Sequence, residues 1–499
     1  MLATALTAAV LGVDAHLVRV ETDTASGFPG FTMLGLPDSS VRESEGRVRA
    51  ALRNCGYKFK WDRRITVNLA PARLRKIGPA FDLATAVGLL AADGVVRPEP
   101  LASVLLTGEL ALDGSLRPVV GVLPMMLAAR RAGVSAAIVP VENANEARLV
   151  SGLEIHAVHN LREAVELAGA SSRPKPPTAA KPLAAALALP DLADVRGQAL
   201  ARRALEIAAA GGHNLLLLGP PGSGKTMLAQ RLPGLLPPLS HDEALETATI
   251  HSAAGLPVAL SGLRPLRAPH HSASDAAVVG GGSIPRPGEV SLAHNGVLFL
   301  DELPEFRRNV LEALRQPLEE RHVTIARSRG SFRFPARFQL VAAMNPCPCG
   351  WHGDGRRVCR CTPGQIRAYV ARISGPVLDR VDLTTEVPAV RYAEMTGPAG
   401  EGSAAVAGRV RRARALQERR TGVANAELSS SQLREVAWPE AEGQSLVAAA
   451  VDRLGLTGRG HDRLLRVART IADLEASATV GGRHVAEALQ FRALGARTD

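Results

Sequence analysis

The sequence Gly219-Pro220-Pro221-Gly222-Ser223-Gly224-Lys225-Thr226 follows an apolar run at 214–218 and precedes a helical pattern at 227–232. This order predicts a buried strand, a glycine-rich turn and the start of a helix, and thus an α/β fold. The pattern G-x-x-x-x-G-K-[ST] in that setting is typical of a loop whose backbone N–H groups and helix N-terminus surround phosphate oxygens. We expect Lys225 to reach the β- and γ-phosphates of a nucleotide, and the Thr226 hydroxyl to bind Mg²⁺.

Two adjacent carboxylates follow a second apolar run, about 75 residues further along the chain. Residues 296–300 predict a buried strand, and Asp301 and Glu302 stand at its end. The carboxyl ends of parallel strands meet at one edge of a sheet, so these side chains are expected beside the phosphate-binding loop. We expect Asp301 to complete the Mg²⁺ site and Glu302 to act as general base toward the attacking water. ATP and Mg²⁺ are therefore the predicted cofactors.

A third polar residue, Asn345, ends the apolar run 338–344. A parallel strand there would place Asn345 where it can sense the γ-phosphate and hold the attacking water. The alternative is a turn-forming asparagine before Pro346. The position of Asn345 after the two carboxylates favours the first interpretation.

The composition is that of a globular chain, with 46% hydrophobic and 21% charged residues among 499. This length predicts about three domains. No apolar run approaches the roughly 20 residues that a membrane helix needs. Residues 1–6 lack the basic start of a secretion signal, so a cytoplasmic protein with no membrane partner is expected.

The formal net charge is +11 and comes from arginine more than from lysine. Such a balance favours contact with phosphates, and hence with nucleic acid. A general bias of the source genome toward arginine, alanine and glycine explains it equally well.

Four of the five cysteines fall within fifteen residues, as Cys347, Cys349, Cys359 and Cys361. Two C-x-C turns separated by nine residues would bring four thiolates together around a tetrahedral Zn²⁺. The spacing departs from the usual C-x-x-C turn, and free reduced thiols are the alternative.

Short apolar runs and helical patterns alternate from residue 10 to about residue 168, which predicts a mixed α/β domain with its own core. The predicted strands are 17–21, 65–69 and 137–140, and the predicted helices are 40–52, 81–90 and 123–132. Proline and serine dominate 171–182, which indicates an interdomain linker.

Within this domain, the stretches 35–38, 68–72, 81–83 and 108–114 resemble the N-terminal domain of the bacterial magnesium-chelatase-like AAA+ proteins of the YifB/ComM group. That domain is similar in fold to the proteolytic domain of Lon. The resemblance continues along the chain and implies a Lon-protease-like α+β domain at 1–170, a linker at 171–188, a P-loop AAA+ core at 189–392 and a helical lid at 393–499.

Lon-type peptidases use a serine nucleophile and a lysine base, but the corresponding stretches here carry Ala80 and Pro124. Neither side chain can attack a carbonyl or accept a proton, which predicts a non-proteolytic module. Lys76 and Asp113 are nearby polar residues that we expect at the surface rather than in catalysis.

The resemblance also implies roles in the AAA+ core. Residues 296–302 resemble the Walker B motif, and Asn345 takes the position of sensor 1. Val195 and Gln198 lie in a segment that packs against adenine in AAA+ proteins, although a helix cap at Asp194 explains the pattern almost as well.

Residues 374–383 resemble the segment that carries the arginine finger in magnesium chelatases and minichromosome-maintenance helicases, which implies Arg380 as the finger. An ion pair with Asp379 or Asp382 is the alternative. A finger acts on a neighbouring subunit, so we expect a homo-oligomeric ring, most simply a hexamer.

Residues 458–474 resemble the sensor 2 helix of the same family. Arg459 is then the residue that contacts phosphate, completing the site of its own chain, with Arg463 as the second choice. The alternative is a solvated basic helix face.

Alternating residues on both sides of 328–331 predict a β-hairpin with a basic tip. In the helicases that this chain resembles, such a hairpin lines the central pore. Arg327, Arg329, Arg333, Phe332 and Phe334 would suit the phosphates and bases of a threaded strand, and an ordinary basic hairpin is the alternative.

His270 and His271 lie in a glycine- and proline-rich insertion before the Walker B motif. A metal site is disfavoured there because the sequence shows neither cysteine nor acidic ligands close by.

The resemblance implies a ComM-like DNA helicase that drives branch migration of recombination intermediates during natural transformation. The alternative is a magnesium-chelatase motor subunit that remodels a protein partner, but those subunits generally lack the Lon-like domain. A peptidase is disfavoured by Ala80 and Pro124.

Overall fold

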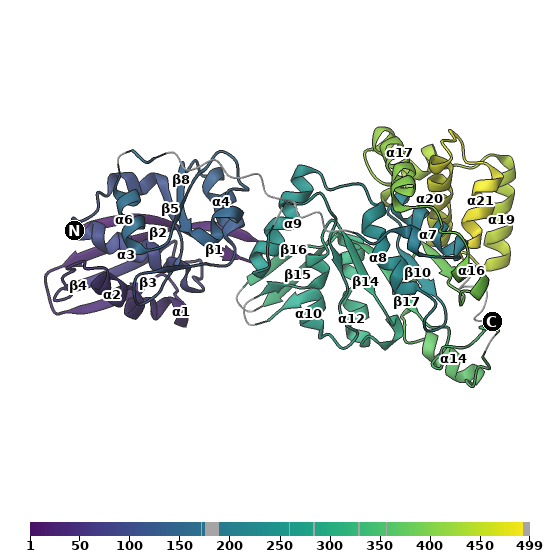
Figure 1. Ribbon diagram of the computed structural model, residues 1–499, viewed down its shortest axis with the longest axis horizontal. Helices are drawn as coiled ribbons and strands as arrows, with labels where there is room; N and C mark the ends of the chain where they lie inside the picture. The colour runs from purple at the N-terminus through teal and green to yellow at the C-terminus, as the bar shows by residue number, and fades with distance from the viewer. Residues whose placement is uncertain are drawn as a thin grey trace. The chain divides into compact units, whose positions relative to one another are not determined.

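The computed structural model describes residues 1–170, 172–174, 189–258, 260–282, 285–327, 330–355 and 357–492, so most of the predicted linker 171–188 lies outside the described residues. The chain forms two compact units (Figure 1). The first is Met1–Ala185 with Ala244–Leu260 and Pro285–Pro287, and the second is Ala186–Glu243 with Ser261–Ile284 and Gly288–Asp499.

The first unit is built on a seven-stranded mixed sheet in the order β3-β4-β2-β1-β5-β8-β9. Its long antiparallel pair aligns Leu6 with Arg19, and its other half is parallel. The strands of this sheet are β1 (Leu2–Leu11), β2 (Asp14–Ala25), β3 (Gly30–Leu34), β4 (Arg64–Ala70), β5 (Val104–Leu106), β8 (Ala136–Pro140) and β9 (Glu154–Val158), while β6 (Glu109–Leu110) and β7 (Leu116–Arg117) pair in a separate two-stranded sheet. The three strands predicted in this domain are confirmed.

The helices of this unit are α1 (Ser39–Arg42), α2 (Ser44–Asn54), α3 (Asp82–Ala92), α4 (Val122–Arg131), α5 (Ala144–Ala147) and α6 (Leu161–Gly169). The predicted helices 81–90 and 123–132 correspond to α3 and α4. The prediction of one helix over 40–52 is wrong, because the chain forms α1 and α2. Asp38 caps the first turn through the Val41 N–H, and the Gly46 N–H bonds to the Glu43 carbonyl three residues back, which tightens the chain between the helices.

Lys76 is not at the surface, and this prediction is wrong. Its side chain is fully buried, and its Nζ donates to the Pro71 carbonyl at 2.6 Å. The backbone of Lys76 pairs with the segment around Pro37, which carries the side chain inward, and burial lowers the pKa of Lys76. Asp113 is exposed, as predicted, while Ala80 and Pro124 are core residues.

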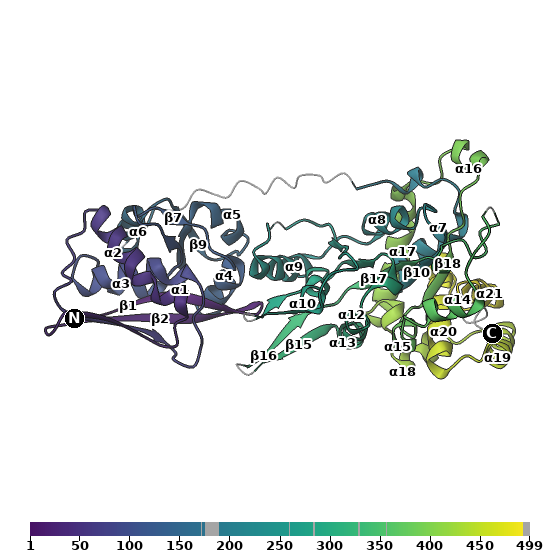
Figure 2. The same cartoon turned by 90° about the horizontal axis from the view of Figure 1, so that it is seen from below.

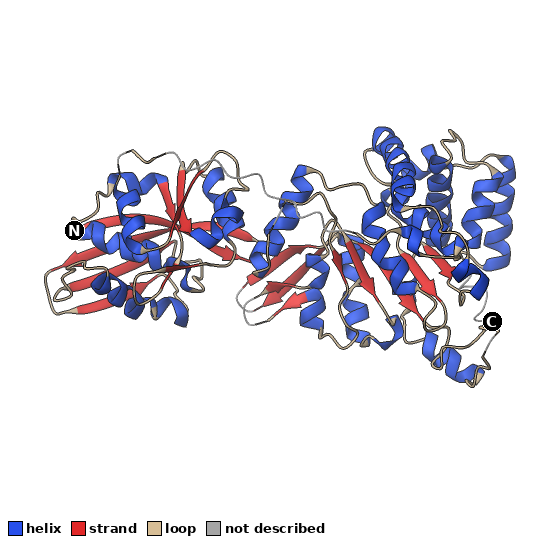
Figure 3. Cartoon of the chain, viewed as in Figure 1, coloured by secondary structure: helices blue, strands red, loops and turns tan. Residues whose placement is uncertain are grey.

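The second unit contains a parallel five-stranded sheet in the order β11-β14-β17-β10-β18, seen in red in Figure 3. Its central strands read as continuous Leu, Val, Phe and Ala runs because both faces are buried. The strands after β9 are β10 (Leu215–Leu218), β11 (Leu266–Arg267), β12 (Gly280–Gly281), β13 (Arg286–Pro287), β14 (Val297–Leu300), β15 (His322–Arg327), β16 (Gly330–Pro335), β17 (Gln339–Met344) and β18 (Leu383–Glu386).

Helices before and between these strands are α7 (Ala199–Gly211), α8 (Lys225–Leu235), α9 (His241–Ala254), α10 (Asp275–Val279), α11 (Glu289–Leu292), α12 (Arg308–Ala313), α13 (Arg315–Glu320), α14 (Pro363–Val370) and α15 (Gly375–Leu378). The helical C-terminal part has α16 (Tyr392–Thr396), α17 (Ser403–Thr421), α18 (Ser430–Val436), α19 (Ala441–Leu454), α20 (Gly458–Leu474) and α21 (Gly482–Gln490). One apolar core joins this part to α7, α8 and the sheet, so core and lid pack as one body.

The predicted hairpin is confirmed: β15 and β16 pair antiparallel, with Thr324 opposite Arg333, and lie side by side in Figure 2. Phe334 is fully buried, so its predicted contact with a threaded base is wrong. Arg333 is exposed because successive side chains of a strand point to opposite faces. Arg329 and the side chain of Arg327 lie outside the described residues.

Within the described part of the chain, no helix is both long and apolar enough to cross a lipid bilayer.

Candidate nucleotide-binding site

The loop 219–226 joins β10 to α8, and its backbone requires glycine. Gly222 and Gly224 have φ of +73° and +97°, in the left-handed region that side chains disfavour. At Gly219 a Cβ atom would lie 2.1 Å from the Val387 carbonyl oxygen of the segment after β18. The loop therefore forms the predicted cradle at the start of α8.

The strand order brings the other predicted residues to this loop. β17 lies between β10 and β14, and the register aligns Leu218 with Met344 and Leu300 with Ala342. All three strands are parallel, so Gly219, Asp301 and Asn345 follow at the same edge of the sheet.

Lys225 is held at the centre of this edge. Its Nζ donates to the carbonyls of Gly219 at 2.7 Å and Pro220 at 2.9 Å, and to Asn345 Oδ1 at 3.2 Å. Burial lowers the pKa of Lys225, and the nearby carboxylates Asp301 and Glu302 oppose this effect. A bound phosphate would satisfy this ammonium group better than the two carbonyls do.

The two carboxylates are placed differently. Thr226 Oγ1 donates to Asp301 Oδ2 at 2.7 Å, so the two residues predicted to hold Mg²⁺ are in direct contact. Glu302 has φ of +53°, an uncommon conformation for a residue with a Cβ, and its side chain is exposed. This arrangement fits one carboxylate for the metal ion and a second for a water molecule.

His271 contacts Glu302, which the sequence did not reveal. His271 Nδ1 lies 3.2 Å from Glu302 Oε2, and the imidazole also packs against Phe306. The prediction from the sequence that no acidic ligand lies close to His271 is therefore wrong. The contact arises because β11 pairs with β14, so the segments that follow the two strands meet. A two-residue strand such as β11 has no pattern that would have signalled this.

Gln198 lies against the phosphate-binding loop. Val195, which precedes it in the same segment, is buried. Gln198 Nε2 donates to the carbonyls of Ser223 and Pro388. Among the described residues, its Oε1 is buried and accepts no hydrogen bond. An unpaired buried acceptor there suits the amino group of adenine. The side chain of Asp194 forms an ion pair with Arg231 and does not cap α7, which begins directly after Gln198. A helix cap at Asp194 therefore does not explain the position of Gln198.

Replacing Gln198 with alanine is expected to weaken ATP binding about tenfold, because one hydrogen bond of roughly 1.4 kcal/mol is lost. GTP carries a carbonyl where adenine has the amino group, so GTP binding should change less. Titration with fluorescent ATP and GTP analogues measures both affinities. Equal losses for the two nucleotides would show that Gln198 only supports the loop.

The two predicted arginines make no contact with the phosphate-binding loop among the described residues. Arg380 forms an ion pair with Glu319, not with Asp379 or Asp382. Burial, together with the nearby Arg315, Arg459 and Arg463, lowers the pKa of Arg380. Among the described residues, Arg459 is one of the arginines whose charge lowers the pKa of Arg380, and it makes no contact with 219–226.

Arg463 has a structural role. It is almost fully buried and donates to the Val381 carbonyl at 3.0 Å and to Asp379 at 3.3 Å. The lid helix α20 thereby holds the segment that carries Arg380. This use of its guanidinium makes Arg463 a poor second choice for a phosphate contact.

The four clustered cysteines converge. Their Sγ atoms all lie within 4.8 Å of one another, and no disulfide is formed. Cys347 is buried, and the other three are partly exposed. The backbone N–H groups of Trp351 and Arg360 lower the pKa of Cys349 to about 6, while burial and the neighbouring thiols raise the pKa of Cys359 and Cys361.

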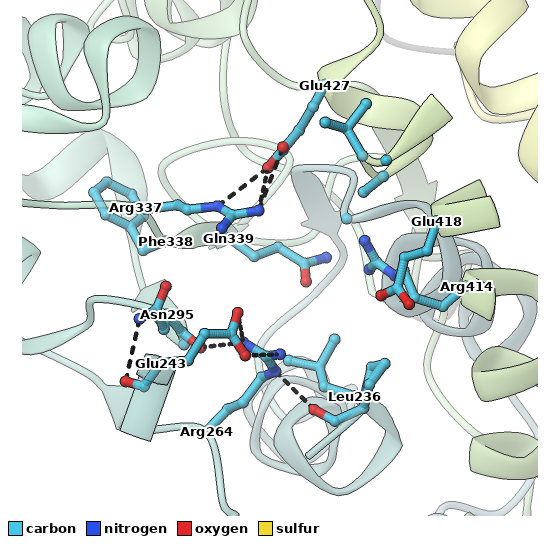
Figure 4. A pocket seen from close by; sticks show the side chains of 16 residues that line it. Leu236, Glu243, Arg264, Asn295, Arg337, Phe338, Gln339, Arg414, Glu418 and Glu427 are labelled. Atoms are coloured by element: carbon cyan, nitrogen blue, oxygen red, sulfur yellow. Dashed lines mark hydrogen bonds and ion pairs between the residues drawn. The ribbon is translucent and has the colours of Figure 1, made fainter. Parts of the chain in front are cut away.

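A separate cavity of about 170 Å³ lies at the amino ends of the strands (Figure 4). Its wall pairs Arg264 with Glu243 and Arg337 with Glu427, and it includes the half-buried Arg414, whose pKa desolvation lowers to about 10. Ligands of open parallel sheets bind at the carboxyl ends of the strands, so this cavity is not the nucleotide site.

Comparison with known proteins identifies the family of this chain. Residues 191–395 match the family described as magnesium chelatase subunit ChlI, residues 20–143 match the subunit ChlI of Mg-chelatase, and residues 400–492 match the ChlI C-terminal family. Competence protein ComM of Haemophilus influenzae is 47% identical over 494 residues, covering 97% of this chain and 96% of ComM.

Two further relatives are similar over different lengths of the chain. The uncharacterized protein YifB of Escherichia coli is 47% identical over 495 residues, covering 98% of this chain and 96% of YifB. A Lon protease of Salinispora arenicola is 30% identical over 173 residues, which is 32% of this chain and 22% of the protease.

Proposed function

The chain belongs to the magnesium-chelatase-like AAA+ family that contains ComM and YifB, and we propose that it is a ring motor that hydrolyses ATP to drive branch migration of DNA. Its fold class is the predicted one, with a Lon-protease-like α+β domain, a P-loop AAA+ core and a helical lid. As a member of this family it is an ATPase that uses ATP and Mg²⁺.

One observation carries the proposal of hydrolysis. Lys225, Asn345 and the pair Thr226–Asp301 meet at one sheet edge, with Glu302 next to Asp301. On nucleotide binding, the Lys225 ammonium would move from backbone carbonyls to phosphate oxygens. Mg²⁺ held by Thr226 and Asp301 would neutralise the phosphate charge, while Glu302 takes the proton of the attacking water and Asn345 orients that water.

The ion pair of Arg380 with Glu319, rather than any contact with its own phosphate-binding loop, supports a site shared between subunits. Neither residue touches the phosphate-binding loop of its own chain among the described contacts. We propose that both reach the γ-phosphate of the neighbouring subunit in a closed ring, expected to be a hexamer. The alternative is the predicted role in which Arg459 contacts phosphate in the site of its own chain.

The support for DNA as the substrate is electrostatic. The net charge is +11, and the hairpin β15–β16 carries exposed Arg333 next to a tip rich in arginine. A basic hairpin can bind the phosphate backbone of a strand without reading its sequence. We place this activity in the cytoplasm.

Replacing Arg327, Arg329 and Arg333 together with glutamine is expected to weaken binding to four-way DNA at least tenfold. The slope of log affinity against log salt should fall by about one for each lost phosphate contact. Fluorescence anisotropy at several salt concentrations measures both quantities.

The matched control removes the same charge from the lid. Arg411, Arg412 and Arg419 are exposed on α17, and their triple glutamine variant should bind DNA as the wild type does. If both triple variants lose affinity equally, net charge rather than the hairpin governs binding.

The direct test compares ATP turnover with and without forked or four-way DNA. Binding at moderate salt and faster turnover support the DNA motor. If DNA neither binds nor stimulates, while the ATPase is intact, the alternative of a motor that remodels a protein partner survives.

We also propose Zn²⁺ as a second metal, held by Cys347, Cys349, Cys359 and Cys361. The donor set of four thiolates suits zinc, and the site is distinct from that of Mg²⁺.

A further inference from the structure

The cysteine cluster has the dimensions of a site for a single ion. Cys347 Sγ lies 3.3 Å from Cys349 Sγ and 3.7 Å from Cys359 Sγ, and the last two are 3.6 Å apart. Four sulfurs bound tetrahedrally at about 2.3 Å from zinc would be about 3.8 Å apart. The observed spacing is far longer than the roughly 2.05 Å of a disulfide.

The two turns that carry the cysteines form a compact loop between β17 and α14. The Gly350 N–H donates to the Cys347 carbonyl at 2.9 Å, and the Cys361 N–H points at Cys359 Sγ at 3.4 Å. Backbone N–H groups directed at sulfur stabilise thiolates, which are the form that binds a metal.

This loop is packed against the nucleotide site. It begins directly after Asn345 and Pro346, and Gly350 lies so close to Pro221 that a Cβ on Gly350 would be 2.6 Å from Pro221 Cδ. Tyr369 of α14 is buried and hydrogen-bonded to the backbone at Asn345. The cluster therefore adjoins both the phosphate-binding loop and the residue that bonds to Lys225.

From these contacts we infer that a zinc ion bound by the four cysteines positions Asn345 and Pro221 for ATP hydrolysis. The inference rests on the proposed ATPase and extends it, since it assigns the zinc site a task in the chemistry. Without the ion, the two turns lose their common anchor, and the segment after Asn345 can shift relative to Pro221. A displacement of about 1 Å at a reacting centre can lower turnover on the order of a hundredfold.

The first experiment measures occupancy. Protein purified without a metal-affinity step is expected to contain about one zinc ion per chain, and the double variant Cys347→Ser/Cys349→Ser to contain almost none. Cys55→Ser is the control, because Cys55 belongs to the first compact unit and lies outside the cluster. Cobalt substituted for zinc should give the absorption of a tetrahedral thiolate complex. Zinc-free wild-type protein would overturn the inference.

The second experiment separates the ion from its contact with the phosphate-binding loop. Gly350→Ala keeps all four cysteines but places a methyl group against Pro221, so it should retain zinc and lose turnover about tenfold or more. Gly353→Ala is a matched control, because Gly353 has a similar φ of +78°, against +83° at Gly350, with no atom within 4 Å of its Cβ position.

The outcomes of these two experiments distinguish a failure of the zinc inference from a failure of the proposed ATPase function. If Gly350→Ala and Gly353→Ala turn over ATP alike, while both hold zinc, the positioning role is overturned and the zinc site stands as a structural one. If the wild type holds zinc but hydrolyses no ATP in any assembly state, the proposed function fails instead. Thermal unfolding of each variant distinguishes a misfolded protein from a displaced loop.

Discussion

Replacing Glu302 with glutamine is expected to abolish ATP turnover, with a loss of at least about 10²-fold, while ATP remains bound. The amide cannot take a proton from the attacking water. It keeps the shape of the side chain and can still bond to His271, so the loop that follows β14 should stay in place. Phosphate release measures turnover, and retention of labelled ATP on the purified protein measures binding.

The control for this variant is Glu305→Gln. Glu305 lies three residues along the chain and forms an ion pair with Arg372 at 3.0 Å, without contacting the phosphate-binding loop. It should hydrolyse ATP normally. Wild-type turnover by the Glu302 variant would exclude this residue as the general base.

Replacing Arg380 with alanine is expected to lower turnover on the order of 10³-fold in the assembled protein, because the neighbouring γ-phosphate loses its cation. ATP binding by the isolated chain should be unchanged, since Arg380 pairs with Glu319 and makes no described contact with its own loop. Arg380→Lys should not restore activity, because a single ammonium cannot reproduce the planar guanidinium.

Mixing the two inactive variants, Glu302→Gln and Arg380→Ala, tests directly whether Arg380 acts across a subunit boundary. An Arg380→Ala chain has an intact Glu302 and lacks only the arginine that it would give to a neighbour. Beside a Glu302→Gln chain it receives that chain's Arg380, so a mixture of inactive proteins should regain turnover. If the mixture stays inactive while each variant still assembles, Arg380 does not act on a neighbour. Arg372→Ala, at an exposed ion pair, serves as the control for loss of one arginine.

The sequence was most informative where local chemistry and local structure coincide. A P-loop needs glycine at fixed positions because its backbone occupies the left-handed region, so Gly222 and Gly224 indicate such a loop in the sequence. Apolar runs that end in Asp301 or Asn345 predict parallel strands with polar ends, and the strand order brings both to Lys225.

Local patterns failed where a side chain's surroundings come from distant segments. Lys76 looked like a surface residue because lysine is rarely buried, but pairing with the segment at Pro37 takes it inside. Phe334 alternates correctly with Arg333, yet alternation does not tell which face of a hairpin is covered.

The sequence alone determined the family, and it predicted the order of domains and the residues of the phosphate-binding loop and Walker B motif, because these depend on spacing along the chain. Only the tertiary structure decided that His271 meets Glu302, that Arg380 pairs with Glu319, and that the cysteine loop packs on Pro221. Those contacts join segments far apart in sequence, and strand order and lid packing, which no local pattern encodes, bring them together.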